Sequence, residues 1–347
     1  MHERGPINPD SLRGIDSQPV VGTSVAMLDM RRVETHIQRA TENGRLSGPS
    51  SPLEYLRYNH CLVELEGEEV STLAGLMCFG HNPQDLFRQA VIDIGHWRGT
   101  DPLSFEVVHL EKNIGGTLVE QLTRVENYIW TNIHHGMRLN NRSFQRSEVH
   151  EYPRAVLREL CVNMIAHRDY TNFRAAARVH LFRNRIEWIS PGGLPPGVTV
   201  NNLLHEQVAR NPVILNILFE AGFVEAIGQG LNTVVYLLER EGMARPVFMD
   251  TGASFMATIY GRPLDIFYGG TIYLNLNERQ HKILSLLRAR PGLSPRDITL
   301  EFPGRSRRSV QRDLSGLVEA QLISAVGEGR ALRYDLANPN PLDEPED

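Results

Sequence analysis

The spacing of hydrophobic residues predicts both helices and strands in the first half of the chain. Positions 118, 122, 125, 129 and 133 are aliphatic and fall on one face of a helix that opens after Gly115 and Gly116. Residues 90–97 and 105–110 alternate between polar and apolar types and carry β-branched residues, which indicates two strands. A separate helix is expected over 27–40. We therefore expect helices to pack on strands in this half.

The middle of the chain continues this mixture of elements. Helix, hairpin, glycine-containing loop, helices and a last strand follow one another, an order that favours an α+β sandwich. The predicted elements are a helix from Pro153 to His167, strands over 178–182 and 185–189, a loop over 190–197, helices over 213–221 and 231–241, and a strand over 254–260.

The C-terminal stretch predicts three helices followed by a hairpin, the order of a winged helix-turn-helix. A first helix is expected over 277–288 and a second after Ser294, which can cap it. The third helix is expected over 305–323, with Ser306 as its cap, and a tight hairpin over 327–334 forms the wing. The expected organisation is a loosely structured lead-in over 1–50, an α+β domain over 51–265, the winged helix over 270–337 and an acidic tail over 338–347.

Charge is distributed unevenly along the 347 residues. The net charge is -5, from 36 basic and 41 acidic residues. Residues 277–333 hold 11 basic and 6 acidic residues, or +5, so the remainder carries -10. A basic end on an acidic body favours a nucleic-acid-binding segment. There is no apolar run of about 20 residues and no signal-like N-terminus, and the three cysteines are scattered. We expect a reduced, cytoplasmic protein without a membrane partner.

Three polar residues line one face of the predicted helix over 153–167. Glu159, Asn163 and His167 recur at intervals of four residues, which places them on a single stripe. A carboxylate one turn from an amide can activate a water and hold a hard cation, as hydrolysis of a nucleotide phosphate requires. A solvated helix face is the alternative explanation of the same stripe.

Two glycine-containing turns follow this helix along the chain, and both are candidates for contacting a nucleotide phosphate. The first is Gly192–Gly193, and the second, Gly228 and Gly230, directly precedes a helix whose exposed N–H groups favour a phosphate. Ordinary loop turns explain the same glycines.

The sequence around these residues resembles the GHKL-type ATPase-like domain of bacterial RecG-related regulators that carry a Schlafen-type AlbA_2 domain. Residues 158–170, 186–196, 209–212 and 227–231 carry the resemblance, in order. It implies that Glu159 is the general base, that Asn163 holds Mg²⁺, and that the glycine pairs at 192–193 and 228–230 contact ATP. Residues 18–24 resemble the stretch after the AlbA_2 domain, so we expect the chain to lack that domain.

Two departures from the family bear on the nucleotide. The Asp of active GHKL ATPases that accepts the adenine amino proton is replaced here by Ile189 or Ser190. The second glycine box, around Gln229, is also shorter than an ATP lid requires. The expectation is therefore weak or absent ATP hydrolysis, with ATP and Mg²⁺ as the cofactors the resemblance implies.

The C-terminal motif resembles the winged helices of bacterial transcriptional regulators. Val310, Leu314, Leu317 and Val318 fix the buried side of the third helix, so its other side is expected to meet double-stranded DNA. Three functions remain open: a regulator with a degenerate ATPase-like domain, a Mg²⁺-dependent ATPase coupled to DNA binding, and a protein-interaction scaffold. A homodimer is expected. The DNA-binding candidates are Arg307, Arg308, Gln311 and Arg312 on the helix, and Arg330 and Arg333 on the wing.

Overall fold

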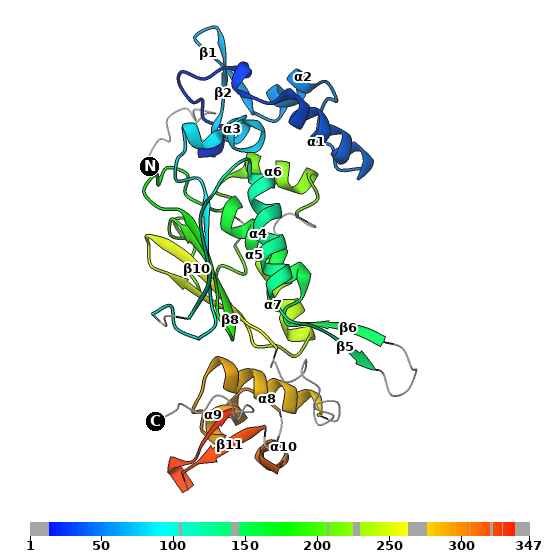
Figure 1. Ribbon diagram of the computed structural model, residues 1–347, viewed down its shortest axis with the longest axis vertical. Helices are drawn as coiled ribbons and strands as arrows, with labels where there is room; N and C mark the ends of the chain where they lie inside the picture. Colours follow the sequence, from blue (N-terminus) through cyan, green and yellow to red (C-terminus); the bar gives the residue numbers. More distant parts are fainter. Residues whose placement is uncertain are drawn as a thin grey trace, which may run out of the picture.

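The structure, a computed structural model, consists of an N-terminal helical part, a central sheet with helices and a C-terminal unit, in that order along its long axis (Figure 1). It describes residues 14–103, 106–139, 146–206, 208–224, 230–262, 276–304, 306–319, 322–327 and 329–336.

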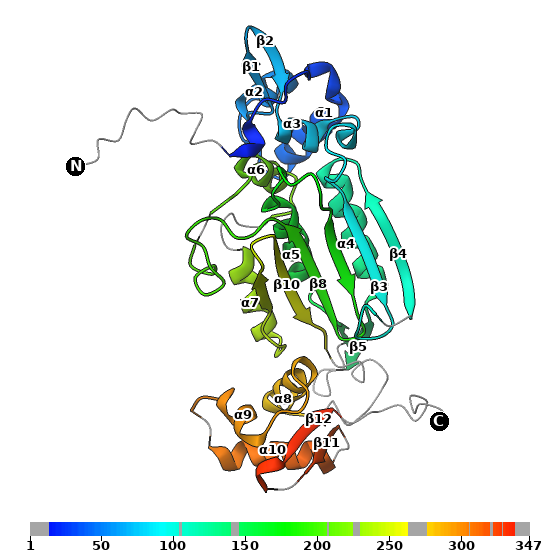
Figure 2. The same cartoon turned by 90° about the vertical axis from the view of Figure 1, so that its left-hand side faces the viewer.

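A six-stranded mixed sheet forms the centre of the molecule. Its strand order is β4-β3-β7-β8-β10-β9, in which β3 and β7 pair in parallel and all other neighbours are antiparallel. Helices α4, α5 and α7 lie on one face of the sheet (Figure 1 and Figure 2). The expected α+β fold is thus confirmed. The strands are β3 (Ile92–Trp97), β4 (Val107–Ile114), β7 (Ala177–Leu181), β8 (Arg185–Pro191), β9 (Val247–Asp250) and β10 (Ser254–Tyr260), and the helices are α4 (Leu118–Asn132), α5 (Arg154–Ala166) and α7 (Gly230–Arg240).

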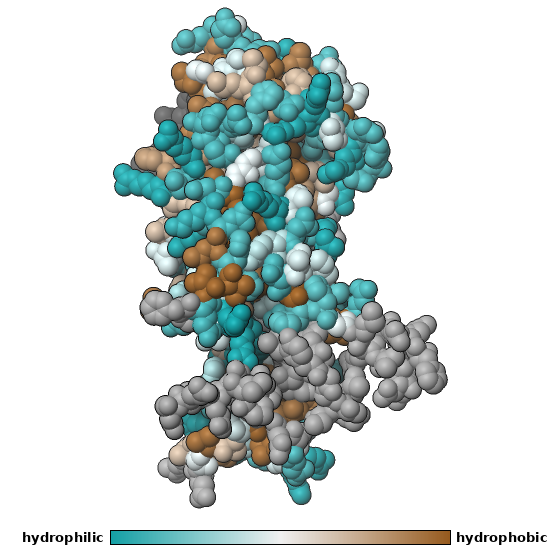
Figure 3. Space-filling model, in the orientation of Figure 1, coloured by the Kyte–Doolittle hydropathy of each residue, from teal (hydrophilic) through white to brown (hydrophobic). Residues whose placement is uncertain are grey.

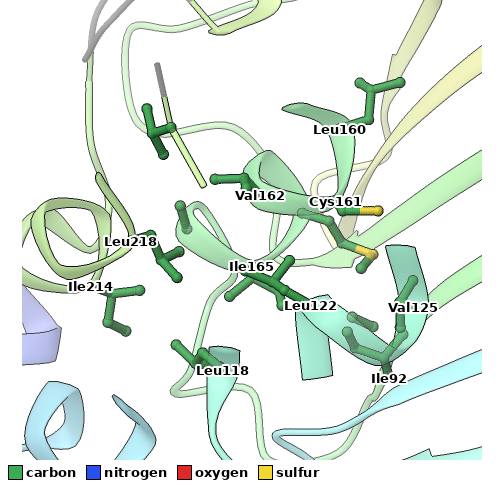
Figure 4. Packing of buried hydrophobic residues seen from close by; sticks show 14 of the residues in the cluster. Ile92, Leu118, Leu122, Val125, Leu160, Cys161, Val162, Ile165, Ile214 and Leu218 are labelled. Atoms are coloured by element: carbon green, nitrogen blue, oxygen red, sulfur yellow. The ribbon is translucent and has the colours of Figure 1, made fainter. Parts of the chain in front are cut away.

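Aliphatic side chains from α4, α5, α6 (Pro212–Glu220) and β3 meet in one core (Figure 4). Leu118, Leu122 and Val125 of α4 face α5, and their periodicity matches the sequence prediction. On α5, Cys161, Val162 and Ile165 belong to the same buried cluster. This packing fixes the rotation of α5, so its polar stripe points to the opposite side, toward α7.

The N-terminal part belongs to the same hydrophobic core. The expectation of a loosely structured lead-in is wrong for residues 14–50, because Val33 and Ile37 are buried and the Asp16 carboxylate accepts a hydrogen bond of 2.9 Å from the Ile214 amide at the start of α6. The many Gly, Pro and Ser residues of this stretch are typical of loops, which is why the sequence did not indicate this packing. The elements are short 3₁₀ turns at Ile15–Ser17, Val25–Met27 and Pro83–Asp85, α1 (Met30–Glu42), α2 (Pro52–Tyr58), β1 (Leu62–Leu65), β2 (Glu68–Ser71) and α3 (Leu73–Phe79).

A separate hydrophobic core holds the C-terminal unit together. Its helices and hairpin follow the expected order, but α10 ends at Glu319, and the residues after Leu322 form a strand instead of the last helical turn. The hairpin expected over 327–334 also differs from the structure. Its two strands are Ile323–Val326 and Arg333–Leu336, so most of the stretch 327–334 is the connection between them. The elements are α8 (Glu278–Ala289), α9 (Pro295–Leu300), α10 (Arg307–Glu319), β11 (Ile323–Val326), a 3₁₀ turn at Gly329–Ala331 and β12 (Arg333–Leu336).

Helix α8 joins this unit to the central sheet. The Arg288 guanidinium donates to the backbone carbonyl of Arg262, beyond the end of β10, and to that of Arg183 at 3.2 Å. The Ser285 hydroxyl donates at 3.3 Å to the carbonyl of Gly242, just past the end of α7. The C-terminal unit is therefore held at the end of the sheet where the β7–β8 turn lies.

On the face shown in Figure 3, exposed hydrophobic residues form small separate patches among hydrophilic ones. A two-stranded hairpin, β5 (His135–Leu139) and β6 (Arg146–His150), projects from the side of the molecule (Figure 1). Within the described ranges, every helix is too short or too polar to cross a bilayer.

Candidate functional site

The polar stripe of α5 lies against the first turn of α7. The Asn163 side-chain amide donates to the Glu159 carbonyl at 2.8 Å and to the Glu159 carboxylate at 3.0 Å. Gly230, the first residue of α7, packs on the same two groups: a Cβ there would lie 2.3 Å from the Glu159 Oε1 and 2.9 Å from the Asn163 Nδ2. Only glycine allows this approach.

The first glycine turn is shaped by β8 and a neighbouring arginine. Gly192 has a φ of +96°, and its amide donates at 2.9 Å to the carbonyl of Ala253. Arg210 lies beside the turn and donates from Nη2 to the Gly193 carbonyl at 2.6 Å. Arg210 was missed by the sequence analysis, which read the 209–212 stretch only as part of the family resemblance. Its isolated position in a loop gives no periodic signal.

Helices α5 and α7, strands β8 and β10, and the connection after β8 line a cavity of about 230 Å³. Of the residues singled out for nucleotide binding, Glu159, Asn163, His167, Gly192, Gly193 and Gly230 all line it, and Gly228 lies outside the described residues. Most of the wall is apolar. Trp188 and Phe255 contribute from the sheet, and further residues come from the long connection between β8 and α6. That connection contributes Leu194, Pro195, Val198, Leu203, Leu204, Glu206, Val208 and Ala209.

His167 caps the C-terminal end of α5 at the cavity wall. Burial and then the nearby positive charge of Arg210 lower the pKa of its imidazole from 6.5 to about 4. The ring is therefore neutral at physiological pH. It can offer the cavity one hydrogen-bond donor and one acceptor, but no positive charge.

Ser190 stands where the resemblance calls for an adenine-binding aspartate. Strand alternation turns Ser190 and Trp188 into the cavity, and Ile189 between them does not line it. The Ser190 hydroxyl donates at 2.8 Å to the Met164 carbonyl of α5. The position is therefore occupied by a hydroxyl that ties the sheet to the helix, in place of a carboxylate.

A Mg²⁺–ATP complex fits this wall incompletely. Glu159 and Asn163 offer oxygen atoms of the kind that Mg²⁺ prefers. However, the lining residues that the structure describes include neither Lys nor Arg. Glu206 adds a second carboxylate to the wall. The charge of the site therefore does not suit the nucleotide that the helix stripe suggests.

A second candidate site lies on α10. Val310, Leu314 and Leu317 are buried, as the sequence analysis expects. Asp313 is also buried and fixes the helix to the start of α8, since Arg279 Nε donates to it at 2.6 Å and Asn277 at 3.0 Å. The opposite side is exposed and carries Arg308, Gln311 and Arg312, and Arg307 is exposed at the N-terminal end of the helix.

The β11–β12 hairpin lies beside this exposed side. The Gln311 amide donates at 3.3 Å to the hydroxyl of Tyr334 on β12, which joins helix and hairpin. Arg333 is exposed on the same strand, and its Nη1 donates to the carbonyl of Leu332 at 2.9 Å. Arg330 falls in the connecting 3₁₀ turn, and its side chain lies outside the described part of the chain.

Comparison with known proteins gives a family match over part of the chain and similarity to solved structures. Residues 175–259 match the family described as "Putative ATP-dependent DNA helicase recG C-terminal". The crystal structure of the DIP2311 protein from Corynebacterium diphtheriae aligns over 93% of this chain with a TM-score of 0.58 and 19% identity. This chain spans 64% of the length of that one. No curated protein matches. Residues 175–259 are therefore similar to an ATPase-like domain of the RecG-related type. The chain shares its fold with the DIP2311 protein.

Proposed function

We propose that the protein is a DNA-binding transcriptional regulator, acting as a homodimer, whose ATPase-like domain is a sensing or structural unit without effective hydrolysis. The observation that carries the proposal is the exposed basic side of α10 opposite its buried side. In the order helix, helix, helix, hairpin, such a surface is the recognition helix of a winged helix-turn-helix.

The charges of the surface support duplex DNA as the partner. Arginine can contact guanine O6 and N7 through two hydrogen bonds, and glutamine can do the same for adenine N6 and N7. Arg308, Gln311 and Arg312 provide these groups on one helix face. The acidic remainder of the chain, at -10, repels DNA and confines its binding to the C-terminal unit.

A matched pair of double variants tests the proposal. Arg308→Ala/Arg312→Ala removes two charges from α10, and Arg31→Ala/Arg39→Ala removes two from exposed positions of α1. Fluorescence anisotropy with duplex DNA over a salt series should show the α10 variant binding at least about tenfold more weakly, with a flatter salt slope. The α1 variant should bind like the wild type. Equal binding by all three proteins contradicts the proposal.

Mg²⁺-dependent ATP hydrolysis is the second candidate function. The family match and the 3.0 Å contact between Glu159 and Asn163 at one cavity favour it. Its test is steady ATP turnover that Glu159→Ala abolishes, together with a rise in melting temperature when ATP is added with Mg²⁺. The missing adenine-binding carboxylate at Ser190 leads us to expect neither result, because an unmatched amino group costs about 1–3 kcal/mol.

A further inference from the structure

We infer that the cavity beside α5 binds a small, largely apolar molecule with a single positive charge, and not a nucleoside triphosphate. The inference deepens the proposed function and rests on it, since this molecule would be the effector that the ATPase-like domain senses. Three features of the cavity carry the argument: the character of its wall, its charge and its size.

The wall is built from aliphatic and aromatic side chains with few polar groups between them. Helix α5 contributes Leu160 and Met164, the sheet contributes Trp188, and α7 contributes Leu231. Burying apolar ligand surface against such a wall is favourable by about 25 cal/mol for each Å². The same wall would remove water from phosphate oxygens without replacing their hydrogen bonds. The wall therefore selects for an apolar body.

The charge of the wall is negative. Glu159 and Glu206 both line the cavity, and His167 stays neutral because its pKa is near 4. Neither Lys nor Arg is among the described residues that line the wall. In a site of lowered dielectric this arrangement attracts a cation and repels an anion.

The positively charged Arg210 lies beside the first glycine turn. Its Nη2 donates to the Gly193 carbonyl, and its Nη1 is buried behind Gly192, where a Cβ would lie 2.3 Å from it. Arg210 does not line the cavity.

The size of the cavity agrees with a compact ligand. Its volume of about 230 Å³ lies below the range of about 300–1,000 Å³ typical of sites for larger ligands, and above the cavity of about 150 Å³ that holds benzene. A body of two fused six-membered rings is of this class.

Isothermal titration calorimetry on the full chain, without DNA, tests the inference with three probes of one shape. These are 1-naphthylmethylammonium, 1-naphthylmethanol and 1-naphthoate, which differ in charge, and ATP with Mg²⁺ is the fourth titrant. We expect the ammonium probe to bind at least about tenfold more tightly than the naphthoate, as one favourable charge contact implies. The alcohol should lie between them.

Variants locate the binding. Glu159→Gln keeps the shape of the side chain, and it should lower the preference for ammonium over alcohol about threefold or more. Glu42→Gln, at an exposed position of α1, should leave the preference unchanged. Ala257→Leu fills the cavity from β10 and should weaken all three probes alike. Urea unfolding of each variant verifies that it is folded.

Three results would overturn the inference: tighter binding of the naphthoate than of the ammonium probe, micromolar binding of ATP with Mg²⁺, or no binding of any probe at 1 mM. Because the titrations contain no DNA, they are independent of the anisotropy test of α10. A protein that binds the ammonium probe but not DNA would contradict the proposed function alone, and the reverse pattern would contradict this inference alone.

Discussion

Gly230 sits where the first turn of α7 touches the polar stripe of α5. Because a Cβ at this position would lie 2.3 Å from the Glu159 Oε1, Gly230→Ala must push Glu159 and Asn163 aside or move α7. We expect the substitution to lower the free energy of unfolding by about 1–3 kcal/mol, the usual cost of overpacking. Urea unfolding followed by circular dichroism measures the change.

Gly316 of α10 provides the matched control for Gly230. A Cβ on Gly316 would meet only the flexible amide end of Gln280, at 3.2 Å. Alanine in a helix is favoured over glycine by about 1 kcal/mol, so Gly316→Ala should be neutral or stabilising. If the two alanine variants change stability equally, the close contact at Gly230 does not exist in solution.

His167 predicts a loss of stability in mild acid. The unfolded chain takes up a proton on this imidazole near pH 6.5, whereas the folded chain does so only near pH 4. Protons therefore bind preferentially to the unfolded state as the pH falls through this window, and the stability conferred by the neutral imidazole is lost. At pH 5 the loss due to His167 should be about 1–2 kcal/mol.

The comparison with His167→Gln isolates this contribution, since Asp16 acts in the opposite direction. Burial raises the pKa of Asp16 from 3.8 to about 6, so the folded chain takes up that proton first. Urea midpoints of wild type and variant at pH 7 and pH 5 give the difference between the two proteins. Identical pH dependence of wild type and variant would show that His167 titrates normally in the folded state.

The sequence predicted the polar half of the candidate site better than its apolar half. Glu159 and Asn163 share one helix face by spacing alone, and the structure places both at the cavity. Leu203 and Val208 come from a connection without regular structure, where no periodicity marks which side chains turn inward. Their positions depend on how that connection folds over α5.

At the scale of elements, strongly periodic stretches were predicted well and short strands were not. The helix over 153–167 and the strand over 254–260 agree with α5 and β10 within a residue or two. Strands β1 and β2 were missed, because each has only four residues and their polar pattern, rich in glutamate, is weak. The third helix of the C-terminal unit was predicted to extend too far, because apolar residues such as Leu322 and Ile323 fit the buried side of a helix as well as that of a strand.

Arg288 makes α8 the element that joins the two cores. Its buried guanidinium satisfies the carbonyls of Arg183 and Arg262, so Arg288→Ala leaves both acceptors without this donor. We expect a loss of about 1–3 kcal/mol, confined to the contact of the C-terminal unit with the sheet. Hydrogen exchange should then quicken in α8 and stay unchanged in α4 and α5.

Arg290, near the end of the same helix, is the control for Arg288. Its guanidinium contacts Glu301 on the exposed surface, and surface ion pairs contribute less than about 1 kcal/mol. Arg290→Ala should therefore leave exchange in α8 close to that of the wild type. Equal quickening in both variants would mean that the carbonyl contacts of Arg288 do not hold α8 to the sheet.

At the scale of the whole molecule, each of the two hydrophobic cores supports one part of the proposed function. The larger core positions the cavity, and the smaller one presents the basic face of α10 at the end of the chain. One such face reads only a few base pairs, so a regulator with one recognition helix per chain reads two half-sites about one helical turn apart. Two-fold symmetry of the protein then matches that of its DNA.

The homodimer that this symmetry requires is the last prediction. Light scattering at micromolar concentration should give twice the chain mass of 39.2 kDa. A duplex with two copies of the preferred site, spaced by about 10 base pairs, should bind much more tightly than a duplex with one copy, because the second contact becomes intramolecular. Moving the copies half a turn apart places them on opposite faces of the duplex and should abolish the gain. A monomeric mass together with spacing-independent affinity would contradict the dimer and leave DNA binding by each single chain.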